Sequence, residues 1–144
     1  MTTTSTRRYA GDITPEQAWK LLGENPDAVL VDVRTDAEWR FVGVPDLSSL
    51  GREVVYIEWN GLDGARNDNF VAELADQLPA AAGARPVIFL CRSGNRSISA
   101  AEAATEAGIA PSYNVLDGFE GHLDAESHRG GVGWRAIGLP WKQT

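Results

Sequence analysis

The chain has 144 residues, of which 43% are hydrophobic and 23% are charged, and a chain of this length and composition folds as one globular domain that buries about two thirds of its unfolded surface. Its net charge of −7 argues against a nucleic-acid surface, because phosphate contacts require clustered lysine and arginine. Its apolar runs are far shorter than the roughly 20 residues needed to span a bilayer, so we expect no nucleic-acid partner and no membrane insertion.

The N-terminal residues show no targeting signal. Residues 1–13 hold Thr, Ser and Arg without the apolar stretch of a signal peptide, and the one cysteine of the chain cannot form an internal disulfide. We therefore expect a cytoplasmic protein. We interpret residues 1–12 as a flexible N-terminal segment and residues 13–144 as a single domain.

The first predicted elements are a helix and a strand. Thr14 lies three residues before Gln17, which is the spacing of a capping box, so we expect a helix that begins here and runs through Leu22. The apolar run at 28–31 is typical of a buried parallel strand, and residues 32–34 close this strand.

A second capping box predicts a short helix. Thr35 and Glu38 have the same spacing, and we expect Trp39 and Phe41 of this helix to face the core. Residues 54–57 then have the apolar and aromatic composition of another strand.

The second half of the chain alternates helices and strands. Apolar side chains recur every four residues over 70–78, which predicts a helix, and residues 87–90 form an apolar strand. The alanine-rich stretch 97–107 predicts a helix that Gly108 ends, and residues 113–116 predict a last strand. Because strands that alternate with helices pair in parallel, we predict an α/β fold with a central parallel β-sheet flanked by helices on both faces.

Cys91 lies between the apolar strand and the alanine-rich helix. A helix N-terminus and the nearby Arg92 and Arg96 would stabilise a thiolate over the thiol, and consecutive N–H groups of such a loop would form an anion-binding nest. An inert core cysteine is the alternative interpretation, but residues 92–96 contain no apolar side chain. We therefore interpret Cys91 as a reactive thiolate in an electropositive, partly exposed setting that binds an anion.

Three predicted strand ends hold polar residues, and in a parallel sheet such ends meet at one edge, where ligands bind. These ends are residues 32–34, 91–96 and 117–121. We interpret Asp32 and Arg34 as supporting residues. A structural ion pair with a neighbour such as Glu38 is at least as good an explanation of their charges as a catalytic role.

No metal or cofactor is expected from the sequence. His122 and His128 are the only histidines, and together with Cys91 they fit no compact zinc spacing. The glycines at 130, 131 and 133 do not form the G-x-G-x-x-G pattern of a nucleotide loop.

Four segments of the chain resemble the single-domain rhodaneses, which are thiosulfate or persulfide sulfurtransferases. The cysteine loop is the most specific of them, and the resemblance covers about residues 13–141. The segments are D-V-R-T-D-A-E-W at 32–39, C-R-S-G-N-R-S at 91–97, N-V-L-D-G-F at 114–119 and G-W-R-A-I-G-L-P-W at 133–141. Where family members often carry G-H-I-P-G-A, this chain has the shorter segment 43–47 without the histidine, whose path the sequence does not define.

The resemblance implies a reaction through Cys91. Cys91 would take a sulfane sulfur from a small anionic donor, thiosulfate or a persulfide, and pass it as a persulfide to cyanide or a thiol. No second cysteine is present to resolve the persulfide, so the acceptor would be another molecule, with an acceptor protein left open. The implied substrate-binding residues are Arg92, Ser93, Gly94, Asn95, Arg96 and Ser97.

Two other functions stay open at this point. Thiolate phosphatases and arsenate reductases place the arginine at C-x5-R, whereas Arg96 stands at C-x4-R, and a change in cradle size decides which anion reaches attack distance. The second alternative is a non-catalytic binding module on the same fold.

Overall fold

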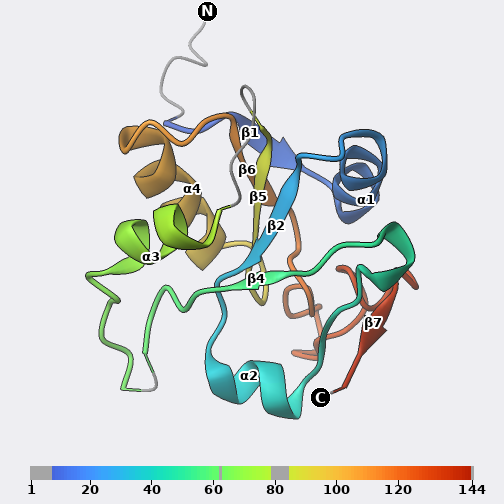
Figure 1. Ribbon diagram of the computed structural model, residues 1–144. Helices are drawn as coiled ribbons and strands as arrows, with labels where there is room; N and C mark the ends of the chain where they lie inside the picture. The colour runs from blue at the N-terminus through green and yellow to red at the C-terminus, as the bar shows by residue number, and fades with distance from the viewer. Residues whose placement is uncertain (1–7, 62, 79–84, 144) are drawn as a thin grey trace, which may run out of the picture.

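A computed structural model describes residues 8–61, 63–78 and 85–143 of the chain (Figure 1). Its centre is a five-stranded sheet in which all neighbouring strands pair in parallel. The strands, in spatial order, are β1 (Gly11–Ile13), β6 (Ser112–Val115), β5 (Val87–Leu90), β2 (Val29–Asp32) and β4 (Val55–Tyr56). Asp32 of β2 lies opposite Leu90 of β5, so the residues that follow these two strands start side by side at the carboxyl edge.

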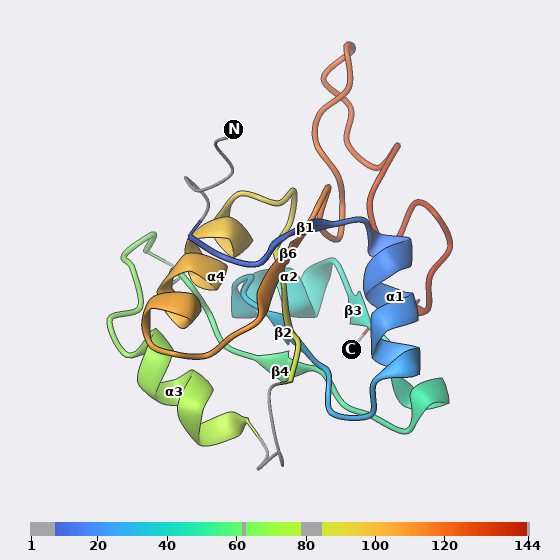
Figure 2. The same cartoon turned by 90° about the horizontal axis from the view of Figure 1, so that it is seen from above.

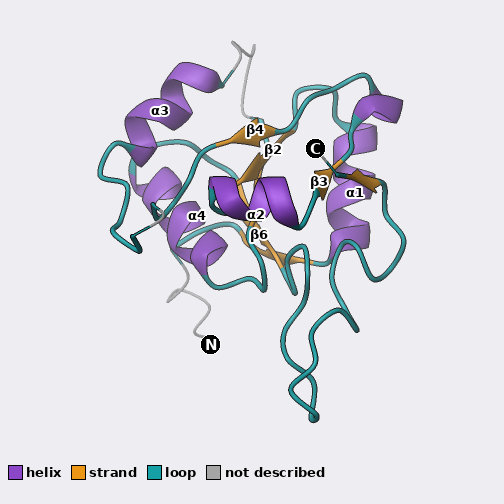
Figure 3. Cartoon of the chain, turned by 90° about the horizontal axis from the view of Figure 1, so that it is seen from below, coloured by secondary structure: helices purple, strands orange, loops and turns teal. Residues whose placement is uncertain are grey.

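Helices cover both faces of this sheet, as predicted. Helices α3 (Phe70–Gln77) and α4 (Arg96–Glu106) lie on one face and α1 (Pro15–Glu24) lies on the other (Figure 2). The short α2 (Asp36–Phe41) crosses the carboxyl edge of the strands, and Figure 3 shows this helix in front of the sheet. A 3-10 turn (Ser48–Leu50) and a two-stranded antiparallel pair, β3 (Val44–Pro45) with β7 (Trp141–Lys142), complete the described elements.

The sheet separates two apolar cores, because side chains alternate between its faces. On one face, Phe70 of α3 and Ala100 of α4 pack against Val31 and Phe89. On the other face, Leu22 of α1 belongs to a cluster with strand residues and the buried Trp134. Both β2 and β5 are buried along their whole length, which explains their nearly continuous apolar sequences.

Both capping boxes predicted from the sequence are present. The Thr14 and Thr35 side chains each accept a hydrogen bond from the N–H of the third helical residue, and the side chain of that residue accepts one from the threonine N–H.

None of the helices formed by the described residues has the length and hydrophobicity of a membrane-spanning helix.

One strand of the central sheet, β1, was not predicted from the sequence, and neither was the small pair of β3 and β7. Gly11 and Asp12, which were assigned to the flexible N-terminal segment, lie in β1 and pair with Tyr113 and Asn114 of β6. A three-residue strand that contains glycine and aspartate has no apolar run that would reveal it. Residues 1–7 of the predicted flexible segment lie outside the described residues.

The expectation that Phe41 faces the core is wrong. Phe41 is 81% exposed, whereas Trp39 is half-buried and contacts Tyr56 edge to face, with ring centroids 5.1 Å apart. Residues two positions apart in a helix point in directions that differ by about 200° around the helix axis, so Trp39 and Phe41 cannot share one face.

Segment 43–47, whose path the sequence left undefined, folds back as β3 against the C-terminal strand β7. Gly43 precedes β3 with φ +113°, and a Cβ there would lie 2.9 Å from the Trp141 ring. This segment therefore closes over the end of the chain.

The exposure of Phe41 predicts a stability difference. Phe41→Ser should leave the free energy of unfolding within about 0.5 kcal/mol of the wild type, because exposed side chains contribute little. Phe70→Ala, which empties a buried position, should cost about 3–5 kcal/mol. Urea unfolding followed by tryptophan fluorescence measures both, and a large loss for Phe41→Ser would contradict the placement of α2.

Candidate functional site

Cys91 is the first residue after β5, and its sulfur lies inside the loop that leads to α4. Cys91 Sγ accepts a hydrogen bond from the Gly94 N–H at 3.1 Å and lies 3.1 Å from Ser97 Oγ. Gly94 has φ +104°, a conformation that favours glycine and turns this N–H toward the sulfur. Cys91 is only 1% exposed, so the expectation of a partly exposed cysteine is wrong.

The segment after β6 holds the cysteine loop from outside. The Cys91 carbonyl accepts from Phe119 N–H at 2.8 Å, and the Arg92 carbonyl accepts from Glu120 N–H at 2.9 Å and Gly121 N–H at 3.2 Å. A trans peptide points its N–H opposite to its carbonyl. The N–H groups of Arg92 and Ser93 therefore point away from this segment, which we call the clamp (residues 118–121).

The clamp approaches the loop so closely that Gly118 has no room for a side chain. A Cβ on Gly118 would lie 2.3 Å from the Cys91 carbonyl oxygen, and its φ is +58°. Only glycine combines that contact with that backbone conformation. Gly118 thus fixes where the first carbonyl of the loop lies.

A buried chain of hydrogen bonds leads from the sulfur to β6 and β1. Asn114 Nδ2 donates to Asp12 Oδ1 at 3.0 Å, so Asn114 Oδ1 faces Ser97, whose hydroxyl donates to it. A serine hydroxyl has one proton. While Ser97 donates to Asn114, its hydroxyl can only accept a hydrogen bond from the Cys91 thiol. If Cys91 is a thiolate, the Ser97 hydroxyl can turn and donate its hydrogen bond to the sulfur instead.

Arg96 is held by Glu38 from α2. Its Nη1 and Nη2 donate to the two carboxylate oxygens of Glu38 at 2.8 and 3.0 Å, and both side chains are largely buried. Burial raises the pKa of Glu38, but the hydrogen bonds from Arg96 and from the Thr35 N–H outweigh burial and hold that pKa below its ordinary value. Burial lowers the pKa of Arg96, and Glu38 more than compensates, so this pKa is raised.

The two loop arginines therefore differ. Arg96 lies within electrostatic reach of Cys91, but its charge is paired with Glu38, a partner that the sequence analysis did not assign to it. Arg92 is exposed and forms no ion pair with the residues that the structure describes. This difference could not be predicted from neighbouring residues, because Glu38 lies 58 positions before Arg96.

Asp32 and Arg34 pair with each other rather than with Glu38. Arg34 Nη2 donates to Asp32 Oδ2 at 2.7 Å and to the Gly43 carbonyl at 2.8 Å, and both side chains are fully buried. The Arg34 guanidinium also lies 4.3 Å from the centroid of the Phe119 ring. These contacts join the end of β2 to the clamp and to the start of β3, which is a supporting arrangement.

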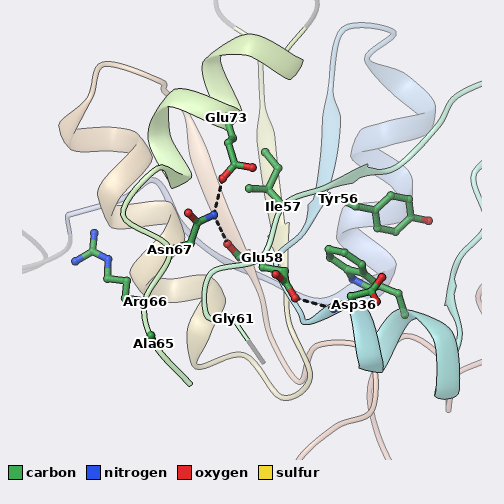
Figure 4. A pocket seen from close by; sticks show the side chains of 10 residues that line it. Asp36, Tyr56, Ile57, Glu58, Gly61, Ala65, Arg66, Asn67 and Glu73 are labelled. Carbon is green, nitrogen blue, oxygen red and sulfur yellow. Dashed lines mark hydrogen bonds between the residues drawn. The ribbon is translucent and has the colours of Figure 1, made fainter. Parts of the chain in front are cut away.

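A hollow of about 460 Å³ lies beside α2, between the end of β4 and the start of α3 (Figure 4). Tyr56 lies on one side of it, and on the other Asn67 donates to the Glu73 carboxylate. Trp39, whose ring contacts that of Tyr56, also lines the hollow. None of its lining residues belongs to the cysteine loop. No cluster of three or more potential metal ligands occurs among residues 8–61, 63–78 and 85–143.

Solved structures place this architecture among rhodanese-like folds. The polysulfide-sulfur transferase homodimer of Wolinella succinogenes matches with a TM-score of 0.60 at 26% identity, covering 92% of this chain and 78% of that one. A rhodanese-like domain protein of Staphylococcus aureus shares the fold at 23% identity, with a TM-score of 0.50, over 75% of this chain and 86% of its own. The chain thus has a rhodanese-like α/β fold.

The family follows from the sequence comparison: the STR4 middle domain model matches residues 10–144, and the chain belongs to this family. A crystal structure of Rv0390 from M. tuberculosis is 76% identical, with a TM-score of 0.89, and the match covers 94% of this chain and 99% of that one. An uncharacterized Rickettsia conorii protein is 37% identical over 91% of this chain and 96% of its own. The rhodanese-like domain-containing protein 4 of Arabidopsis thaliana chloroplasts is 29% identical over 88% of this chain, which spans 24% of it.

The close approach of the clamp predicts a position-specific effect of alanine. Gly118→Ala should destabilise the protein by about 1–3 kcal/mol, because the new Cβ meets backbone and the φ becomes strained. Gly131→Ala is the matched control, since a Cβ there meets nothing within 4 Å. Thermal unfolding measures both variants, and equal melting temperatures would contradict the clamp.

The low pKa of Glu38 predicts how stability changes with pH. A group whose pKa is lower in the folded state stabilises the fold above its unfolded pKa, here 4.5, and loses this contribution as the pH falls through its folded pKa. The stability advantage of the wild type over Glu38→Gln should therefore be complete at neutral pH and shrink below about pH 4.5. Urea unfolding across this range measures it, and a difference independent of pH would contradict the ion pair.

Proposed function

We propose that the protein is a sulfurtransferase that carries a sulfane sulfur on Cys91 as a persulfide. The observation that carries the proposal is the contact of the only thiol with the Gly94 N–H and the Ser97 hydroxyl, in a loop whose first two carbonyls are tied outward to the clamp. The rhodanese-like fold and the similarity to a polysulfide-sulfur transferase support it.

The reaction consists of two displacements at sulfur. In the first, the Cys91 thiolate attacks the outer sulfur of the donor, the S–S bond of the donor breaks, and its remainder leaves with the bonding electrons, as sulfite from thiosulfate or a thiolate from a persulfide. In the second, an external thiol or cyanide attacks the outer sulfur of the persulfide and restores the Cys91 thiolate. No external oxidant is needed, because in each displacement the nucleophile supplies the electron pair of the new bond to the transferred sulfur and the leaving group takes the electron pair of the broken one.

The loop groups have separate roles in this scheme. The Gly94 N–H and the start of α4 stabilise negative charge on sulfur. When the thiolate forms, the Ser97 hydroxyl turns and donates its hydrogen bond to the sulfur instead of to Asn114. Asn114, which holds this hydroxyl beside the sulfur, acts as a positioning residue. The outer sulfur of a persulfide lies about 2 Å beyond Sγ, and this outer sulfur is the atom that the acceptor attacks.

The ion pair of Arg96 favours sulfur transfer over the phosphatase alternative. A phosphatase arginine must direct its N–H groups at phosphoryl oxygens, whereas Nη1 and Nη2 of Arg96 both donate to Glu38.

The second alternative is a non-catalytic binding module. Such a module would not need a thiol in contact with N–H and hydroxyl groups, and its mass would not change on incubation with a sulfur donor.

The test is mass spectrometry of the protein after incubation with thiosulfate or glutathione persulfide. We expect one added sulfur atom on Cys91, which dithiothreitol removes, and no added sulfur on the folded Cys91→Ser variant. Steady-state sulfur transfer to cyanide should fall to background in the same variant. Full transfer by Cys91→Ser, or rapid hydrolysis of an aryl phosphate by the wild type, would contradict the proposal.

A further inference from the structure

We propose that Glu38 sets the donor class of this site, and that the site takes sulfur from organic persulfides, R–S–SH, in preference to the thiosulfate dianion. The inference rests on the proposed function and deepens it. It follows from how the charged side chains around the cysteine loop are paired.

Two arginines at this edge of the sheet, Arg96 and Arg34, are already neutralised. Arg96 is bound through both terminal nitrogens to Glu38. Arg34, whose charge is also felt at Glu38, is bound to Asp32. These four partly or fully buried side chains sum to zero charge, and of the described cations on the loop only the exposed Arg92 is left without an ion pair.

A site whose charged side chains are paired with each other favours a neutral sulfur donor over an anionic one. Attack on thiosulfate brings two negative charges beside a thiolate, and in a partly buried site the repulsion is screened less than in water. A neutral persulfide adds no negative charge before attack. The Gly94 N–H and the helix start can hold one developing charge, whereas a second one would need an unpaired cation.

The carboxylate of Glu38 is not required for the start of its helix. In α1 the same capping-box position is held by Gln17, whose side-chain oxygen accepts from the Thr14 N–H at 2.8 Å. A glutamine can likewise accept from the Thr35 N–H, as Glu38 does at 3.1 Å. The negative charge of Glu38 therefore acts on Arg96, and through Arg96 on the site.

The persulfide step balances without a further reactant. The Cys91 thiolate attacks the outer sulfur of R–S–SH, a new S–S bond to Cys91 forms, the old S–S bond breaks, and R–S⁻ leaves with the electron pair. The proton stays on the transferred sulfur or passes to the departing thiolate. One negative charge enters the step and one leaves it.

The experiment compares the rates at which Cys91 gains one sulfur from 2-hydroxyethyl persulfide, whose organic part carries no charge, and from thiosulfate, read by mass spectrometry at equal donor concentrations. The wild type should load at least about tenfold faster from the persulfide. Glu38→Gln frees the charge of Arg96, so it should raise the ratio of the thiosulfate rate to the persulfide rate by about fivefold or more.

Asp36→Asn is the matched control. It removes one negative charge from the same helix, but Asp36 pairs with Arg40 at the surface, so both rates should stay at the wild-type values. Wild-type loading from thiosulfate as fast as from the persulfide would overturn the inference, and so would a folded Glu38→Gln with an unchanged ratio of rates. The wild-type ratio decides even if Glu38→Gln does not fold. Absence of loading from both donors would instead overturn the proposed function itself.

Discussion

The ion pair between Glu38 and Arg96 is the contact on which the site depends. Glu38 closes the capping box of α2, and Arg96 is the first residue of α4, so one ion pair joins the starts of two helices and fixes the cysteine loop between them. Both side chains are more than three-quarters buried, and removal of either partner leaves the other charge uncompensated. The same contact that orders the loop also decides how much positive charge the loop can offer a ligand.

The parallel sheet supplies the rest of the site from its carboxyl edge. β5 ends at Leu90, directly before Cys91, and β2 ends at the buried Asp32, whose partner Arg34 reaches the segment before β3. β6 contributes Asn114 and leads into the clamp, while β1 supplies Asp12 behind Asn114. Because these strands are adjacent and in register, polar groups that lie far apart in the sequence gather at one edge of the sheet, where Cys91 lies.

The sequence predicted what local patterns encode. The capping boxes at Thr14 and Thr35, the apolar strands and the place of Cys91 between a strand and a helix could all be read from neighbouring residues. The partners of Arg34 and Arg96 could not, because the choice of partner depends on which strand ends and helix starts meet in space. The burial of Cys91 was also missed, since its polar loop suggested exposure, whereas Cys91 is almost fully buried and its carbonyl is bound by the clamp, residues 118–121. Phe41 was misplaced because hydrophobicity alone does not fix the face of a six-residue helix.

The most direct test of the account is a single turnover with protein freed of donor. The protein is loaded with glutathione persulfide, desalted, and then mixed with cyanide, and the thiocyanate formed is measured together with the mass of the chain. The account predicts one thiocyanate per loaded chain and the return of Cys91 to its unmodified mass. A loaded chain that keeps its sulfur in the presence of cyanide or a thiol, or thiocyanate formed without a loaded Cys91, would contradict it.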